Sequence, residues 1–170
     1  MAKRQLKGNI RETFAVRQEL KLLLVDEDAS DLGYYAEVLR YLGYEVQPVD
    51  SYASAAAALG LQRFDLVIVD QGTSNFEGRA VLSRAVETHQ HVPVLVLTRV
   101  VDADCCIEAL DAGAYEYVQK PLTVAEVRDL VGDYVKRPDE KIQAGHEYAY
   151  QADLAGAGSP VGPGAWQKAS

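Results

Sequence analysis

The stretch LVIVDQGTSNFEG, residues Leu66 to Gly78, places four apolar, mostly β-branched residues directly before Asp70 and a polar loop that contains glycine. β-Branched residues favour strands, and glycine among polar residues favours a turn. A strand that ends on an acidic residue at a loop either presents that carboxylate for chemistry or only solvates its own end. The other strands of the chain decide between these two interpretations.

Short apolar runs and longer amphipathic segments alternate along the middle of the chain. The apolar runs are continuous, as strands are in a parallel sheet covered by helices on both faces. Thr123 and Glu126 form a T-x-x-E capping box. The pattern predicts a doubly wound (βα)5 fold of the α/β class, with a five-stranded parallel sheet in three α/β/α layers. We expect strands at Lys21–Val25, Tyr44–Val49, Leu66–Val69, Val94–Leu97 and Tyr115–Val118, and helices at Ser30–Leu42, Ser54–Leu61, Arg79–Thr88, Ala103–Leu110 and Val124–Val135.

The composition is that of one globular domain. A chain of 170 residues with 48% hydrophobic residues can build a single core. Its longest apolar runs have the length of strands and fall far short of the roughly 20 residues of a membrane span. No apolar stretch follows the basic residues at the beginning, as it would in a secretory signal, so we expect a cytoplasmic protein. The adjacent Cys105 and Cys106 suit neither a disulfide framework nor a spaced metal site, which favours reduced thiols.

Charge and composition divide the chain into three segments. Residues 1–20 form a basic N-terminal extension, residues 21–137 form the domain, and residues 138–170 form a Gly/Pro/Ala-rich linker or disordered tail. The net charge is −8, so direct binding of nucleic acid is not expected. The basic extension is either a solvated arm or a contact for an acidic partner or for membrane headgroups.

Polar residues follow four of the five predicted strands. In a doubly wound sheet, ligands bind beyond the carboxyl ends of the strands, where the strand order reverses. Three carboxylates brought together there repel one another unless a cation neutralises them, and oxygen ligands with room for water suit Mg²⁺. A hydroxyl and an ammonium beside the metal suit a bound phosphoryl group. The residues are Asp26 and Glu27 after the first strand, Asp70 after the third, Thr98 after the fourth, and Lys120 with Pro121 after the fifth.

The ordered motifs VDED, LVIVD, VLVLT and YVQKP resemble the receiver domain of two-component response regulators, which has the CheY-like, flavodoxin-like fold. The resemblance spans Lys21 to about Arg137. It implies a phosphorelay signalling protein whose output is binding rather than catalysis. The expected partners are a sensor histidine kinase or phosphotransfer protein, and a downstream protein or a second copy that binds the surface of residues 102–135.

The resemblance implies a role for each residue at the strand ends. Asp70 would accept a phosphoryl group from a phosphohistidine. Asp26 and Glu27 would hold Mg²⁺ together with Asp70 and the backbone carbonyl of Gly72. Thr98 and Lys120 would contact the phosphoryl oxygens. Tyr117 takes the position of the family's aromatic switch, which packs inward when the threonine moves toward the phosphoryl group, and Pro121 is a candidate for a cis peptide bond.

Several residues near the expected site differ from the family's usual pattern, among them Gly72 and Arg99. Gly72 has no side chain, which should widen access to the site. Arg99 stands where a small residue is usual, and it is a possible modulator that could pair with the phosphoryl group or with Glu27, or obstruct donor and water. Asp28 and Asp31 are interpreted only as capping acids of the first helix.

Two other classes of function stay open. A pseudo-receiver would keep the fold and the acidic pocket but signal without phosphate, and Arg99 filling the pocket would favour it. A metal-dependent phosphohydrolase with an aspartate nucleophile would need an acid two residues after Asp70, where Gly72 stands, and a substrate lid. The cognate kinase and the downstream target do not follow from the sequence.

Overall fold

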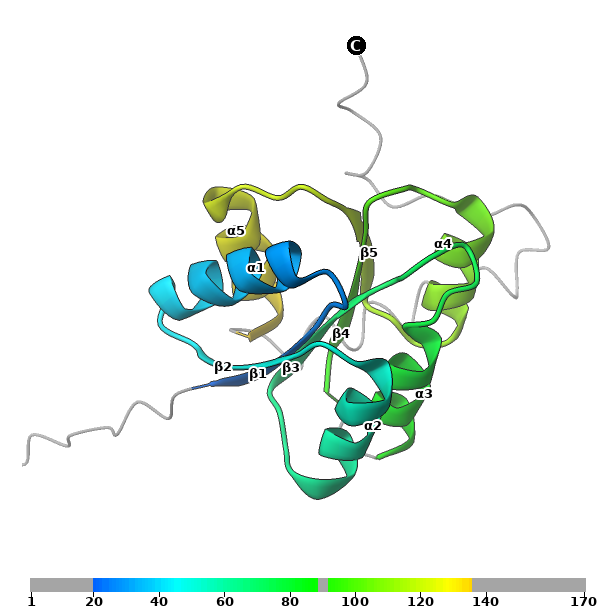
Figure 1. The fold of residues 1–170 in the computed structure, drawn as a ribbon, viewed down its shortest axis with the longest axis horizontal. Helices are drawn as coiled ribbons and strands as arrows, with labels where there is room; N and C mark the ends of the chain where they lie inside the picture. The colour runs from blue at the N-terminus through cyan, green and yellow to red at the C-terminus, as the bar shows by residue number, and fades with distance from the viewer. Residues whose placement is uncertain (1–19, 89–91, 136–170) are drawn as a thin grey trace, which may run out of the picture.

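The computed structural model describes residues 20–88 and 92–135, in which five strands alternate with five helices (Figure 1). All strand pairs are parallel, in the order β2-β1-β3-β4-β5. The expected extension lies outside the described residues except for residue 20, and the expected tail, 138–170, lies outside them entirely. The strands are β1 (Lys21–Val25), β2 (Glu45–Val49), β3 (Leu66–Asp70), β4 (Val94–Thr98) and β5 (Glu116–Gln119), and the helices are α1 (Ala29–Tyr41), α2 (Tyr52–Leu61), α3 (Arg79–Glu87), α4 (Ala103–Asp111) and α5 (Val124–Val135).

The predicted doubly wound α/β fold is confirmed, with helices on both faces of the sheet. Helices α1 and α5 cover one face, and α2, α3 and α4 cover the other (Figure 1). Successive side chains of a strand point to opposite faces. In β1, Leu22 and Leu24 therefore pack with α1 and α5, whereas Leu23 and Val25 pack with the other three helices. The sheet therefore separates two buried clusters.

Two central strands run one residue further than predicted, and they include site residues. β3 contains Asp70 and β4 contains Thr98, because parallel pairing continues through Asp70 with Leu97 and through Thr98 with Gln119. β2 and β5 lie at the edges of the sheet and are only partly buried, so the expected full coverage holds for β1, β3 and β4 alone. Pro48, which has no N–H to donate, fits β2 because β2 is an edge strand.

Side chains fix the beginnings of α1, α4 and α5 close to the strand ends. Asp28 caps α1 by accepting hydrogen bonds from two backbone N–H groups of the first turn. Asp102 caps α4 in the same way, through one N–H. The predicted capping box of α5 is confirmed, because the Thr123 N–H donates to Glu126 Oε2 at 2.8 Å and the Glu126 N–H donates to Thr123 Oγ1 at 3.3 Å.

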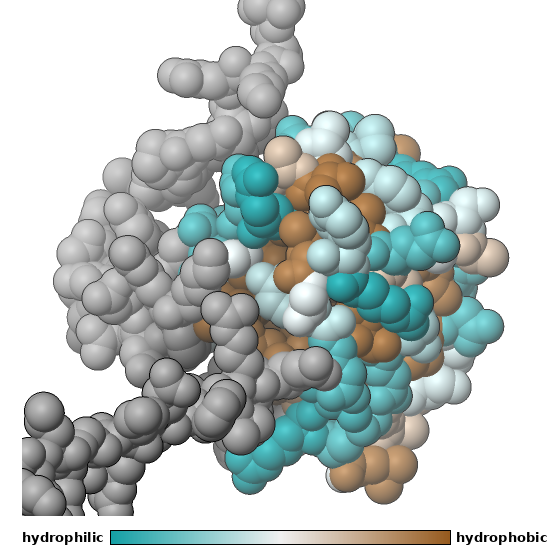
Figure 2. All heavy atoms as spheres, turned by 90° about the vertical axis from the view of Figure 1, so that its left-hand side faces the viewer, coloured by the Kyte–Doolittle hydropathy of each residue, from teal (hydrophilic) through white to brown (hydrophobic). Residues whose placement is uncertain are grey.

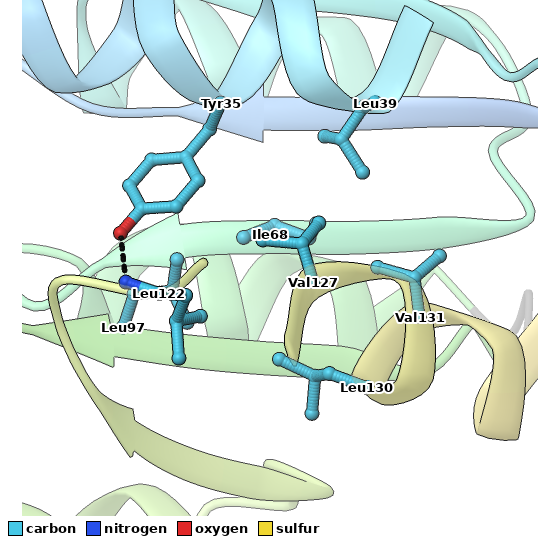
Figure 3. Close-up of a pocket in the computed structure, with 8 residues that line it drawn as sticks. All are labelled: Tyr35, Leu39, Ile68, Leu97, Leu122, Val127, Leu130 and Val131. Carbon is cyan, nitrogen blue, oxygen red and sulfur yellow. Dashed lines mark hydrogen bonds between the residues drawn. The ribbon is translucent and has the colours of Figure 1, made fainter. Parts of the chain in front are cut away.

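An apolar pocket lies between α1, α5 and the sheet (Figure 3). Its volume of about 10 Å³ would hold about one water molecule, so it belongs to the core. At one end, the hydroxyl of Tyr35 accepts a hydrogen bond from the N–H of Leu122 at 3.1 Å. The neighbouring Tyr34 donates to the Leu122 carbonyl at 3.0 Å. These two bonds attach the loop between β5 and α5 to α1.

The outer surface of the described domain is mixed in polarity. On the face shown in Figure 2, hydrophilic residues lie between small apolar areas. Among the described residues, no helix combines the length and the apolar character that a membrane span requires.

Candidate functional site

The carboxyl ends of the strands surround a pocket of about 210 Å³ at the point where the strand order reverses between β1 and β3. The pocket brings together six residues that the sequence predicted for the site. It also contains two residues that the sequence analysis did not assign to the site, Asp28 and Tyr52. The predicted residues that line the pocket are Asp26, Glu27, Asp70, Gly72, Arg99 and Lys120.

Lys120 lies at the centre of the charged groups. Its ammonium is 2.6 Å from Asp70 Oδ1, and it is 2.8 Å from both Asp26 Oδ2 and Asp31 Oδ2. Burial disfavours the charge of Lys120, but the hydrogen bonds to these carboxylates outweigh it and raise the pKa of the ammonium above its usual value. The ammonium of Lys120 therefore offsets the expected repulsion among the carboxylates. Asp31, interpreted as a capping acid only, is one of its partners.

Asp70 is held by contacts from three elements. Lys120, after β5, binds Oδ1. The N–H of Gly72 donates to Oδ2 at 2.7 Å, and the hydroxyl of Tyr52, the first residue of α2, donates to the same oxygen at 3.4 Å. Burial is the main cause that raises the pKa of Tyr52, and nearby carboxylates such as Asp70 raise it further. The hydroxyl therefore stays protonated and can donate a hydrogen bond. These contacts fix the orientation of the Asp70 carboxylate at the pocket.

Asp26 and Glu27 differ in exposure. Asp26 is buried, and its Oδ1 accepts the N–H of Asp28 at 2.9 Å while its Oδ2 binds Lys120. Burial raises the pKa of Asp26 above its usual value, although the hydrogen bonds from Lys120 and Asp28 oppose the shift. Glu27 is exposed and lines the pocket opening to solvent. The Asp26 carboxylate is thus held by buried hydrogen bonds, whereas the Glu27 carboxylate lies where it can reach a ligand in the pocket.

The donor set of the pocket fits Mg²⁺ in its chemistry. Asp26, Glu27, Asp70 and the backbone of Gly72 offer oxygen ligands only, and the volume leaves room for water. Across residues 20–88 and 92–135, however, no three His, Cys, Asp or Glu side chains are already grouped as a metal site. Lys120 contacts one oxygen of Asp26 and one of Asp70, and the other oxygen of each carboxylate accepts a backbone N–H.

Gly72 does not widen the pocket as expected. It has a φ of +86°, in the left-handed region, and a Cβ at this position would lie 2.4 Å from Glu77 Oε2 and 3.0 Å from the Tyr52 hydroxyl. The Glu77 carboxylate is fixed there by the N–H and the hydroxyl of Thr73, at 2.7 and 2.6 Å. The space beside Gly72 is therefore filled by other side chains, and glycine is required for both backbone and packing reasons.

Arg99 points to the acids of α1. Its Nη2 is 2.9 Å from Asp28 Oδ2 and 3.0 Å from Asp31 Oδ1, and its Nε donates to Asp31 Oδ2 at 3.0 Å. The guanidinium therefore pairs with Asp28 and Asp31 and not with Glu27, which was one of its expected partners. The Arg99 hydrogen bond is the main reason why the pKa of Asp31 lies below its usual value. Arg99 thus connects the end of β4 to α1 at the rim of the pocket.

Thr98 and Tyr117 lie beside the pocket and do not line it. Thr98 is buried, and its hydroxyl donates to the carbonyl of Val100 at 2.8 Å. The Tyr117 hydroxyl donates to Gln71 Oε1 and accepts the N–H of Asp102 at 3.4 Å. Thr98 is therefore adjacent to the site, with its hydroxyl directed into the loop that precedes α4.

The predicted cis peptide bond between Lys120 and Pro121 is confirmed. Four residues that contact the site or its neighbours were not predicted from the sequence: Asp28, Asp31, Tyr52 and Gln71. Tyr52 comes three residues after the end of β2, so the strand-end rule, applied to this strand as well, would have pointed to it. Gln71 is a polar residue that directly follows Asp70, but nothing in the sequence alone signals that it is buried.

This arrangement on a doubly wound sheet agrees with comparisons with known proteins. The chain belongs to the family of response regulator receiver domains, whose family model matches residues 22–132. It is 33% identical over 116 residues to the transcriptional regulatory protein ZraR of Salmonella typhimurium, covering 68% of this chain and 26% of that protein. It is 30% identical over 125 residues to the chemotaxis protein CheY-3 of Vibrio cholerae, covering 72% of this chain and 96% of that one.

Solved structures give the same result. A receiver domain protein from Clostridium thermocellum has a TM-score of 0.63 and 26% identity, and the match covers 70% of this chain and 96% of that one. A putative response regulator from Chloroflexus aurantiacus has a TM-score of 0.63 and 29% identity, covering 71% and 100%. The chain spans about a quarter of the length of ZraR, because the match covers 26% of that protein.

Proposed function

We propose that this receiver domain is a phosphoacceptor, and that Asp70 takes a phosphoryl group from a phosphohistidine of a sensor kinase or phosphotransfer protein. The observation that supports this proposal most is the Asp70 carboxylate at the mouth of the pocket, 2.6 Å from the ammonium of Lys120. A fixed carboxylate beside a permanent cation supplies both the nucleophile and the neutralising charge that phosphoryl transfer requires.

In the transfer, an oxygen of Asp70 forms a bond to phosphorus while the bond between phosphorus and the histidine nitrogen breaks. Lys120 exchanges part of its contact with the carboxylates for the phosphoryl oxygens. Mg²⁺ held by Asp26, Glu27, Asp70 and the Gly72 carbonyl would offset the repulsion between the carboxylate and the anionic phosphoryl group. The hydrogen bonds to Asp70 from Gly72 and Tyr52 keep the carboxylate aligned during the attack.

The signal would leave the site through Thr98. Its hydroxyl now donates to the Val100 carbonyl, and turning toward a phosphoryl oxygen would break that bond and move the loop before α4. Tyr117 would respond, and the surface of residues 102–135 would change its affinity for a downstream protein or for a second copy of the chain. Output by binding agrees with the relatives, whose names describe transcriptional regulators and a chemotaxis protein.

A pseudo-receiver is the second candidate, and one observation favours it. Lys120 already binds three carboxylates, and Arg99 already binds two, so the positive charges of the pocket are satisfied without phosphate. A pocket that signals without phosphate would be expected to look like this. The two candidates differ in whether the pocket responds to a phosphoryl group.

The test is a titration of the protein with beryllofluoride, a phosphoryl mimic, with and without Mg²⁺, followed by heteronuclear NMR. The phosphoacceptor predicts a spectral change around the pocket and α4 that requires both ligands. Asp70→Asn should remove this change, because the amide is nearly isosteric but has lost the anionic oxygen. A wild-type protein that shows no change with both ligands present would contradict the phosphoacceptor and select the pseudo-receiver.

A further inference from the structure

Gln71 is a polar side chain that is 2% exposed, directly after Asp70. Its Nε2 donates to the carbonyl of Thr73 at 2.9 Å, and its Oε1 accepts the hydroxyl of Tyr117. Its backbone N–H donates to Leu97 at 2.7 Å, so the residue is also tied to β4. A buried amide is costly unless both ends have partners. The burial of Gln71 therefore depends on its bond to Tyr117.

The Tyr117 hydroxyl joins two segments on either side of the site. It donates to Gln71, in the loop after β3, and it accepts the N–H of Asp102, the N-cap of α4, at 3.4 Å. Burial raises the pKa of Tyr117, so the hydroxyl remains protonated and can donate. The ring packs against the apolar cluster between the sheet and α2, α3 and α4. Tyr117 is thus held inward by a hydrogen bond to the phosphoacceptor loop.

The loop that carries Gln71 depends in turn on Asp70. Asp70 Oδ2 accepts the N–H of Gly72 at 2.7 Å, and the Gln71 side chain binds the next carbonyl, that of Thr73. A change at the carboxylate therefore acts on the backbone that positions the Gln71 amide. A second contact of this loop with α4 supports the connection, because the Cys105 thiol lies 3.5 Å from the carbonyl of Ser74.

We propose that Gln71 is a positioning residue that couples the state of Asp70 to the inward position of Tyr117. This inference rests on the proposed function and adds a route that does not pass through Thr98. The route runs from the Asp70 carboxylate to Gly72, to the Gln71 amide, to the Tyr117 hydroxyl and to the N-cap of α4. By linkage, a bond that favours inward Tyr117 also favours binding of a phosphoryl group, provided that the inward state is the one that binds it better.

The experiment measures the affinity of the full chain for beryllofluoride at saturating Mg²⁺. Gln71→Met keeps the length of the side chain and removes the amide, and Tyr117→Phe keeps the ring and removes the hydroxyl. Each should weaken binding by about three- to tenfold, the size of one intramolecular hydrogen bond. The loss in the double variant should be smaller than the sum of the two single losses, because both substitutions remove the Gln71–Tyr117 bond.

Tyr115→Phe is the matched control, since Tyr115 packs with Tyr134 on the other face of the sheet and should bind like the wild type. Hydrogen exchange of α4 should increase in Gln71→Met and Tyr117→Phe and stay unchanged in Tyr115→Phe. If Gln71→Met fails to fold, Gln71→Leu takes its place in the comparison with Tyr117→Phe. Wild-type affinity in Tyr117→Phe, or additive losses in the double variant, would overturn the coupling alone. A wild-type protein that does not bind beryllofluoride would overturn the proposed function and the coupling with it.

Discussion

Arg99 and Asp31 form a two-point ion pair that joins the end of β4 to the first turn of α1. Nε of Arg99 is 3.0 Å from Asp31 Oδ2, and Nη2 is 3.0 Å from Oδ1. The same Asp31 carboxylate also binds Lys120 at 2.8 Å. Asp31 therefore links Arg99, at the rim of the pocket, to Lys120 at its centre. A substitution of Arg99 should change the surroundings of both Asp31 and Lys120.

Arg99→Ala should open the rim of the pocket. Without the guanidinium, a small phosphodonor and water both have easier access to Asp70, so phosphorylation and loss of the phosphoryl group should each become several-fold faster. The measurement is the rise and decay of phosphoprotein with Mg²⁺ present throughout. Arg128→Ala is the matched control, because Arg128 is an exposed arginine of α5 that pairs with Asp129. Rates equal to the wild type would mean that Arg99 does not limit access.

The Arg99–Asp31 pair also predicts a pH dependence of stability. The pKa of Asp31 is lowered in the folded state, chiefly by the Arg99 hydrogen bond, from an ordinary value of 3.8. Its stabilising contribution is therefore present above that value and is lost as the pH falls through the lower, folded pKa. Urea unfolding at neutral pH and below about pH 4 should show a smaller acid loss in Arg99→Ala than in the wild type. An identical acid loss in both proteins would contradict this assignment.

Gly72→Ala should destabilise the fold. The new methyl group meets Glu77 and Tyr52, and the positive φ adds about 1–2 kcal/mol of backbone strain. Gly33, in the middle of α1, is the matched control, because a Cβ there meets nothing within 4 Å. Gly33→Ala should stabilise by up to about 1 kcal/mol. Chemical denaturation measures both, and a Gly72→Ala variant as stable as the wild type would show that the loop accepts a side chain there.

Lys120 should set the size of the metal response. Lys120→Met leaves the buried Asp26 without its cation, which should cost about 3–5 kcal/mol. Mg²⁺ should raise the melting temperature of the wild type modestly and that of Lys120→Met by more, because the metal then replaces the missing charge. A double Asp26→Asn, Glu27→Gln variant should lose the response. A melting temperature of the wild type that does not depend on Mg²⁺ would count against a metal site in this pocket.

The convergence of Asp26, Asp70 and Lys120 could be predicted from the sequence. The carboxyl ends of parallel strands share one edge of the sheet, so residues at those ends meet whatever the details of packing. The continuous apolar runs of the three central strands, β1, β3 and β4, were also sufficient to predict where these strands lie in the sequence. β5 was predicted least accurately, one residue too early at both ends, because it is an edge strand with polar residues at partly exposed positions.

The partners of long side chains could not be predicted in the same way. Several acidic residues were possible partners of Arg99. The side chain pairs with Asp28 and Asp31 because of where α1 begins relative to β4. The contact of Tyr52 with Asp70 likewise depends on how α2 packs on the sheet. Such contacts join residues from different elements, so local sequence patterns do not report them.

The role of Asp70 is tested by phosphorylation of the protein with a small phosphodonor and Mg²⁺, followed by intact mass and by peptide mapping. We expect one acid-labile phosphoryl group, located on the peptide that contains Asp70 and absent when Mg²⁺ is chelated. Asp70→Asn should take up none while keeping the wild-type fold. Phosphate incorporated by Asp70→Asn at the wild-type level, or a wild-type protein that takes up none, would contradict the central claim that Asp70 is a phosphoacceptor.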